Sequence, residues 1–154
     1  MFRRILLPVD GSLSMVPLVR KCLAFAAAIG AHVVVLHVVP VAAHRAGSAA
    51  DTAADTAADS AADSAADTAA KASADPAQIL ADVASQAALL GVSCEGKLLA
   101  GAEPWQTILQ AASGGDIDLI CMGSHGRHGA TERVLASQAA RVLEHTQLPV
   151  LLFR

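Results

Sequence analysis

The sequence predicts an α/β fold in which a mostly parallel, five-stranded sheet carries helices on both faces. Five short apolar runs alternate with four segments whose apolar residues recur every three or four positions. Strands that alternate with helices in this way favour parallel pairing through crossover helices. The chain has 154 residues, of which 54% are apolar and 3% aromatic, so a single domain over residues 1–154 can build its core mainly from Ala, Val, Leu and Ile.

The first 40 residues predict a strand, a helix and a second strand. Residues 4–9 form a short apolar run that ends at Asp10-Gly11-Ser12, which is typical of a strand followed by a turn. A helix follows and Gly30 closes it; its buried stripe comprises Leu18, Cys22, Phe25 and Ile29. Residues 33–39 are apolar and mostly β-branched, as expected of a strand covered on both faces, and Pro40 ends them.

A low-complexity insertion at about residues 45–74 separates the two halves of the chain. Residues 51–70 repeat the motif Asp-Thr/Ser-Ala-Ala five times. Alanine favours helix, but an aspartate at every fourth position stacks like charges along one side, and no side chain of the repeat is large enough to fill a core. We expect a solvated, mobile segment without chemistry of its own.

The next helix begins at Asp75, which serves as its cap, with Pro76 in the first turn. Gly91 ends this helix, and its buried stripe comprises Ile79, Val83, Ala87 and Leu90. A weaker strand over residues 92–100 is interrupted by Gly96.

The last elements are two helices and two strands. Glu103-Pro104-Trp105 opens a helix that carries Ile108, Leu109 and Ala112. Residues 116–122 form the fourth strand and residues 149–153 the last. The helix between them carries Val134, Leu135, Ala139, Val142 and Leu143.

Composition excludes several classes of protein. With 11 basic and 14 acidic residues the formal net charge is −3, which lacks the basic face of a general nucleic-acid binder. The apolar stretch after Arg3 and Arg4 is too short for a signal peptide, and the longest apolar run, residues 31–43, falls short of the roughly 20 residues of a membrane span. The three cysteines are widely spaced and predict buried thiols of a reduced compartment. We expect a soluble, cytoplasmic protein that binds neither nucleic acid nor membrane.

Two loops have the composition of a ligand site. In open α/β sheets, ligands bind at the carboxyl ends of strands where the strand order reverses. The loop at Asp10 follows the first strand, and residues 123–129, Gly-Ser-His-Gly-Arg-His-Gly, follow the fourth. Glycines let the backbone approach an anion, and the helix behind the loop adds the positive end of its dipole. A tight turn that needs positive φ explains these glycines equally well.

Four separated motifs resemble the universal stress protein family, and the resemblance covers nearly the whole chain apart from the insertion. They are residues 5–12 (Ile-Leu-Leu-Pro-Val-Asp-Gly-Ser), residues 36–39 (Leu-His-Val-Val), residues 122–127 (Met-Gly-Ser-His-Gly-Arg) and residues 136–143 with the ending 148–152. The resemblance implies a Rossmann-like fold, related to the adenine nucleotide alpha hydrolases, with strand order 3-2-1-4-5. It also implies a homodimer paired through the last strand, Pro149–Phe153.

The resemblance further implies a site for ATP or another adenine nucleotide, with Mg²⁺ accompanying the phosphates. The family's ATP motif is Gly-x-x-Gly, nine residues, then Gly followed by Ser, Thr or Asn. Gly123 and Gly126 fit it, but Ala136-Ser137 stands where the last glycine is expected. The added methyl group would crowd the phosphates unless the local φ is negative.

Carried over residue by residue, the resemblance assigns each part of the nucleotide. Asp10, beside Pro8 and Val9, would accept hydrogen bonds from the ribose hydroxyls or the adenine. Val38 would contact the base and Met122 would cover it. The phosphates would be surrounded by two segments, the glycine-rich loop and the turn at Ala136. Their residues are Gly123, Ser124, His125, Gly126 and Arg127 in the loop, and Ala136, Ser137 and Gln138 in the turn.

Several of these residues have simpler explanations. Asp10 alone could make an Asx turn with the two residues that follow it, and Ser137 could bond within its helix. His125 and His128 fit solvated loop residues better than metal ligands, because no third ligand has suitable spacing. His32 and His37 fit packing and hydrogen bonding, and Trp105 fits a packing anchor.

Three functional hypotheses follow. The first is a nucleotide-binding stress protein without catalytic residues, which would hydrolyse ATP very slowly at most. The second is a dimeric interaction protein of the same family that binds no nucleotide, and Ala136 favours it. The third, an enzyme, is disfavoured: the chain lacks the Ser-Gly-Gly-x-Asp-Ser pyrophosphate loop of ATP-splitting ligases, and also the acidic pair, phospho-acceptor and lysine of a receiver domain.

Overall fold

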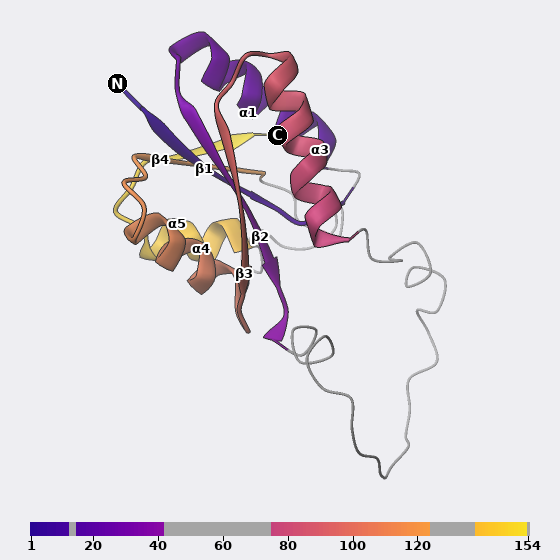
Figure 1. The fold of residues 1–154 in the computed structure, drawn as a ribbon. Coiled ribbons are helices and arrows are strands. Elements are labelled where there is room, and N and C mark those ends of the chain that lie inside the picture. Colours follow the sequence, from indigo (N-terminus) through magenta and orange to yellow (C-terminus); the bar gives the residue numbers. More distant parts are fainter. Residues whose placement is uncertain (13–14, 42–74, 124–137, 154) are drawn as a thin grey trace, which may run out of the picture.

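Five parallel strands form one sheet in the order β3-β2-β1-β4-β5 (Figure 1). The computed structural model describes residues 1–12, 15–41, 75–123 and 138–153. The fold class and the strand order expected from the sequence are confirmed. The insertion at 45–74 and the predicted helical residues Val134 and Leu135 lie outside the described residues.

The first half of the chain supplies the centre of the sheet. It forms strand β1 (Arg4–Val9), helix α1 (Val16–Ile29) and strand β2 (His32–Val39). Gly30 ends α1 as predicted: its φ of 69° lies in the left-handed region, which a glycine reaches without the steric penalty of a Cβ atom.

The second half supplies both edges of the sheet. It forms α3 (Pro76–Leu89), β3 (Cys94–Ala100), α4 (Pro104–Ser113), β4 (Leu119–Gly123), α5 (Gln138–His145) and β5 (Val150–Phe153). Asp75 caps α3 as predicted, because its side chain accepts a hydrogen bond from the backbone N–H of Ala77 at 3.1 Å.

Some predicted details are wrong. The apolar spacing predicts Leu90 in the buried stripe of α3, but this residue lies at the C-cap, beyond the helical period, and is 48% exposed. Leu143 lies in α5, as predicted, and is 45% exposed because the inner face of that helix is made by Ala139 and Val142. Gly96 does not interrupt β3: the strand continues through it, paired with Val35, and Leu80 of α3 lies above it.

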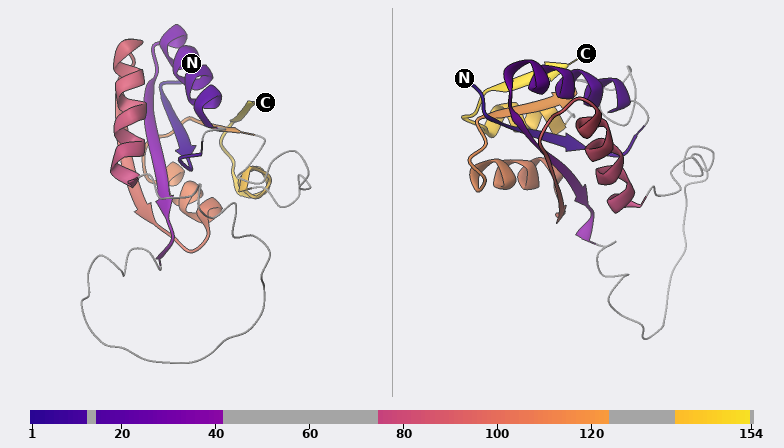
Figure 2. Two further views of the ribbon diagram at one scale, coloured as in Figure 1. Left: turned by 90° about the vertical axis from the view of Figure 1, so that its right-hand side faces the viewer. Right: turned by 45° about the horizontal axis from the view of Figure 1, so that its top comes forward.

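The two faces of the sheet carry separate cores. Helices α1 and α3 cover one face, where Leu7, Val35 and Leu23 are fully buried. Helices α4 and α5 cover the other, where Leu6, Leu36 and Val142 are fully buried. Figures 1 and 2 show this three-layer arrangement. Each such side chain contributes about 1.5–3 kcal/mol through burial, so the helices are held mainly by apolar contact.

The strand order reverses between β1 and β4, and these strands pair over a short stretch. The β1–β2 register runs from Arg4 to Val9, whereas the β1–β4 register covers only Ile5 with Leu119 and Leu6 with Ile120. At the amino-terminal end, the carboxylate of Asp118 accepts hydrogen bonds from the backbone N–H groups of Arg3 and Arg4 at 2.7 and 3.0 Å. The recorded β1–β4 pairing therefore stops before the carboxyl ends of the two strands. A ligand crevice is expected at those ends.

No helix in the described part of the chain is long and apolar enough to cross a membrane.

Candidate functional site

The candidate site lies at the carboxyl ends of the three central strands. Pro8 and Val9 end β1, Asp10 follows them, and Val38 lies near the end of β2. Met122 and Gly123 end β4, beyond the last recorded β1–β4 pair. The fold thus brings residues that are more than 100 positions apart in the sequence to one edge of the sheet.

An apolar surface forms on the α4/α5 face at this edge. Val38 and Met122 belong to the core cluster of that face. Pro8 is the register partner of Leu36, another member of the cluster, so it points to the same face. Met122 is buried, whereas Pro8 and Val38 are partly exposed. Side chains from three strands therefore place apolar atoms beside the carboxyl ends of β1 and β4, an arrangement that suits a flat aromatic ring.

Val9 points to the opposite face. Its side chain is 7% exposed and packs with the core under α1 and α3. Any contact of Val9 with a ligand on the α4/α5 face would involve its backbone.

Asp10 is held by a local turn. Its Oδ1 accepts a hydrogen bond from the backbone N–H of Ser12 at 2.9 Å, the Asx turn that the sequence allowed. Gly11 inside the turn has a φ of 74°, and a Cβ at this position would meet the side chain of Ile79 on α3. The turn fixes the direction in which the carboxylate leaves the end of β1.

His37 supports the same turn from β2, which sequence reasoning did not connect with the site. Its Nδ1 lies 2.9 Å from the carbonyl oxygen of Val9, the residue before Asp10, and the ring donates this hydrogen bond. His32 similarly hydrogen-bonds to Ser93 at 2.8 Å. The hydrogen-bonding roles expected of both histidines are confirmed. That His37 lies at the candidate site follows only from the strand register, in which it is the partner of Val9.

Gln138 ties α5 to α4. Its Oε1 accepts a hydrogen bond from the backbone N–H of Trp105 at 3.0 Å, in the first turn of α4. The Trp105 ring packs against the core of this face, with its centroid 4.7 Å from that of His145. Arg141 lies over the same ring at 5.9 Å and pairs with Glu103 at 3.6 Å. Trp105 is thus the packing anchor that the sequence predicts, and Gln138 has a structural role besides the predicted one.

Six of the predicted site residues lie outside the described residues: Ser124, His125, Gly126, Arg127, Ala136 and Ser137. Within the described residues, no group of three or more His, Cys, Asp or Glu side chains could hold a metal ion.

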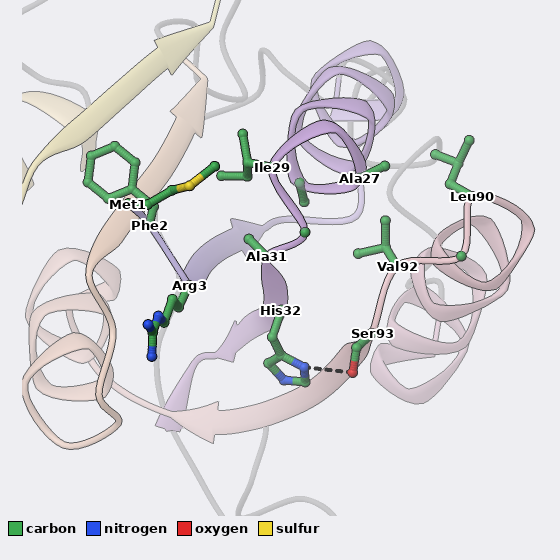
Figure 3. A pocket seen from close by; sticks show the side chains of 13 residues that line it. Met1, Phe2, Arg3, Ala27, Ile29, Ala31, His32, Leu90, Val92 and Ser93 are labelled. Atoms are coloured by element: carbon green, nitrogen blue, oxygen red, sulfur yellow. Dashed lines mark hydrogen bonds between the residues drawn. The ribbon is translucent and has the colours of Figure 1, made fainter.

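A cavity of about 560 Å³ opens at the opposite, amino-terminal edge of the sheet (Figure 3). Met1 and Phe2 lie on one side of it, Leu90 and Val92 on the other, and the hydrogen-bonded pair of His32 and Ser93 below them. The carboxyl ends of α1 and α3 border this cavity and carry partial negative charge. It is therefore unsuited to a phosphate group, and the carboxyl edge of the strands remains the candidate site.

Comparison with known proteins is consistent with this architecture. The whole chain, residues 1–154, matches the family model described as the universal stress protein family. A curated relative, the universal stress protein in the QAH/OAS sulfhydrylase 3′ region of Thermus aquaticus, is 43% identical over 67 residues. This alignment covers 44% of the chain and 49% of the relative, so the chain matches about half of the relative's length.

Solved structures of similar fold cover nearly the whole chain. A universal stress protein in complex with cAMP has a TM-score of 0.70 at 19% identity, covering 99% of this chain and 97% of its own. UspA from Lactobacillus plantarum has a TM-score of 0.64 at 24% identity, covering 99% and 98%. The universal stress protein from Archaeoglobus fulgidus in complex with dAMP has a TM-score of 0.62 at 19% identity, covering 99% and 98%. At these identities the likeness establishes the fold.

Proposed function

The chain belongs to the universal stress protein family, and we propose that it binds an adenine nucleotide at the carboxyl ends of β1, β2 and β4. The observation that carries the proposal is the apolar surface of Pro8, Val38 and Met122 beside the carboxylate of Asp10. The apolar side chains would hold the adenine, and Asp10 would accept hydrogen bonds from the ribose hydroxyls.

The phosphates would point toward Gly123 and the residues that follow it. There the backbone N–H groups of Gly123, Gly126, Arg127 and Ser137 would bind phosphate oxygens, with Mg²⁺ as the accompanying cation. Two neighbours of the same fold, one in complex with cAMP and one with dAMP, support an adenine nucleotide as the ligand class. Ala136, in place of the motif's last glycine, would reduce affinity for a triphosphate more than for a monophosphate.

The first experiment is a calorimetric titration of the protein with ATP, AMP and cyclic AMP, after any co-purified nucleotide has been removed. Binding of at least one of them is expected. Tight AMP binding with weak ATP binding would attribute the difference to the phosphate region around Ala136. If none of the three binds, the proposal is wrong, and the alternative, a dimeric interaction protein without nucleotide, takes its place.

Variants of Asp10 separate its turn from its contact with a ligand. Asp10→Asn keeps an oxygen for the Ser12 N–H but replaces the second acceptor with a donor, so we expect at least a tenfold loss of affinity at unchanged thermal stability. Asp10→Ala also loses the turn, and should lower both affinity and stability. Unchanged affinity in both variants would remove Asp10 from the site.

We further propose that the bound nucleotide acts as a signal for partner choice rather than as a substrate. The sequence offers no residue that resembles a catalytic base poised near a γ-phosphate, so ATP incubated with the protein should be recovered almost unchanged. The protein would act in the cytoplasm as a homodimer paired through Pro149–Phe153.

A further inference from the structure

The turn that carries Asp10 follows a part of β1 with a recorded strand partner on one side only. Within the described part of the chain, β1 pairs with β2 as far as Val9, whereas its pairing with β4 stops at Leu6. Pro8 lacks a backbone N–H, so it donates no hydrogen bond to a neighbouring strand. The direction in which the chain leaves β1 therefore depends on contacts other than β1–β4 pairing.

His37 restrains the turn from β2. Its Nδ1 donates a hydrogen bond of 2.9 Å to the carbonyl oxygen of Val9. This oxygen belongs to the peptide group that joins Val9 to Asp10, and a peptide group is planar. Holding the oxygen therefore fixes the plane from which the Asp10 side chain projects.

Ile79 restrains the same turn from the first turns of α3. Gly11 has a φ of 74°, and the side chain of Ile79 occupies the space that a Cβ on Gly11 would need. Ile79 is partly buried and packs against the core under α1 and α3. The turn is thus hydrogen-bonded from one element and covered by another.

Both side chains lie on the face of the sheet away from the proposed adenine surface. Val35 belongs to the core under α1 and α3, and side chains two positions apart on a strand share a face, so His37 lies on that face as well. Ile79 packs against the same core, whereas the apolar surface lies on the opposite face. An effect of either residue on a nucleotide would therefore pass through the Asp10 turn.

We propose that His37 and Ile79 are positioning residues, which together hold the Asp10 turn in the conformation that binds the nucleotide. This inference rests on the proposed function. Neither side chain needs to touch the ligand: a carboxylate held in its binding direction loses less conformational entropy when the ligand arrives. The two residues would therefore raise affinity through Asp10.

Variants of His37 test the hydrogen bond by calorimetric titration with AMP and with ATP. His37→Leu removes the donor and should weaken binding about tenfold, whereas His37→Asn places an amide N–H at the same position along the side chain and should restore most of the affinity. His32 is a matched control, because its Nδ1 is similarly hydrogen-bonded, to Ser93 at 2.8 Å, at the other end of β2. His32→Leu should leave the affinity unchanged.

Ile79 has a matched control in the next residue of α3. Leu80 is also partly buried, packs against the same core and lies over a glycine, but this is Gly96 on β3. Ile79→Ala and Leu80→Ala both remove packed aliphatic atoms, so both should lower the unfolding midpoint. Only Ile79→Ala should weaken nucleotide binding, by about three- to tenfold. Equal effects of the two variants on affinity would overturn the role of Ile79.

A double-mutant cycle separates positioning from a general loss of stability. Asp10→Asn keeps the turn but removes the acceptor from the ligand contact. If His37 acts through Asp10, His37→Leu should cost less than about twofold in affinity when Asp10→Asn is already present. Losses that multiply independently would overturn the proposal.

The wild-type protein distinguishes failure of this inference from failure of the proposed function. If it binds neither AMP nor ATP, the nucleotide site itself is wrong and the inference falls with it. If it binds but His37→Leu binds equally well, the inference alone is wrong. Should His37→Leu not fold, ¹⁵N NMR of the wild-type imidazole still tests the contact: the neutral ring should carry its proton on Nδ1, and a proton on Nε2 would overturn the proposal.

Discussion

Asp10 combines an observed structural role with a proposed role in ligand binding. Its Oδ1 makes the Asx turn with Ser12, and the carbonyl before it is held by His37, so the residue is already oriented before a ligand arrives. Because the side chain is already restricted, less conformational entropy would be lost when a ligand binds. The structural explanation and the functional one are therefore compatible at this position.

Substitution of Gly11 by alanine is predicted to cost more stability than the same substitution at Gly30, a glycine of similar backbone conformation. Gly11 and Gly30 have φ of 74° and 69°, but a Cβ would meet Ile79 only at Gly11. Gly30→Ala should cost about 1–2 kcal/mol from the left-handed backbone alone, and Gly11→Ala should cost at least about 1 kcal/mol more. Urea denaturation of both variants tests this difference. Equal losses would show that Ile79 moves aside freely.

Cys22 predicts a loss of stability at alkaline pH. In the folded state, the pKa of the Cys22 thiol is raised by the hydrogen bond to Cys121 and by burial. In the unfolded chain, this thiol has the pKa of an ordinary cysteine, about 8.5. Above that pH the unfolded state loses a proton that the folded state keeps, so the free energy of unfolding falls as pH rises, by at most about 1.4 kcal/mol per unit. Denaturation between pH 7 and 10 under reducing conditions should show a shallower decline in Cys22→Ala.

The helices differ in what determines their ends. Asp75 and Gly30 act locally, and the sequence predicts both caps. The start of α4 instead depends on Gln138, 33 residues away, whose side chain accepts from the Trp105 N–H. A side chain from another element thus accepts a hydrogen bond from a backbone N–H in the first turn of α4, where no local side-chain cap is present.

Gln138 is predicted to stabilise the contact between α4 and α5. Gln138→Leu removes the acceptor and should cost about 1 kcal/mol, whereas Gln138→Glu keeps an oxygen and adds a charge that a helix N-terminus favours, so it should be nearly neutral. Thermal unfolding measures the difference. The fluorescence of Trp105, the single tryptophan of the chain, should change in the leucine variant only. Identical behaviour of the two variants would contradict this role.

At the scale of the whole molecule, the sheet has two edges of different character. β3 bears Glu95 and Lys97, which take part in ion pairs, whereas β5 is a short apolar strand, Val-Leu-Leu-Phe. Charged side chains discourage pairing at a sheet edge, and an apolar edge invites it. This asymmetry supports β5 as the strand that pairs in the proposed homodimer.

Equivalent leucines at the two edges test the dimer. Leu152 on β5 is 39% exposed and Leu98 on β3 is 47% exposed. If two copies pair through β5, Leu152→Lys should shift the protein to a monomer in light scattering, while Leu98→Lys should leave the dimer intact. A monomeric wild-type protein, or a dimer that survives Leu152→Lys, would contradict the proposal.

Local patterns in the sequence predict the elements and most of their ends, and they point to two loops as the candidate ligand site. Apolar periodicity, proline and glycine act over a few residues, so β1, α1 and β2 can be predicted from the residues they contain. The predicted strand order and the proposed ligand class rest on the motifs that the chain shares with the family.

Which side chains contact one another depends on the tertiary structure. The periodicity does not show that Pro8, Val38 and Met122 share a face, or that His37 holds the carbonyl of Val9. It also overestimates burial at Leu90, because this residue lies at the C-cap of α3, beyond the helical period. These contacts join residues tens of positions apart. They depend on strand register and helix packing, which no local pattern specifies.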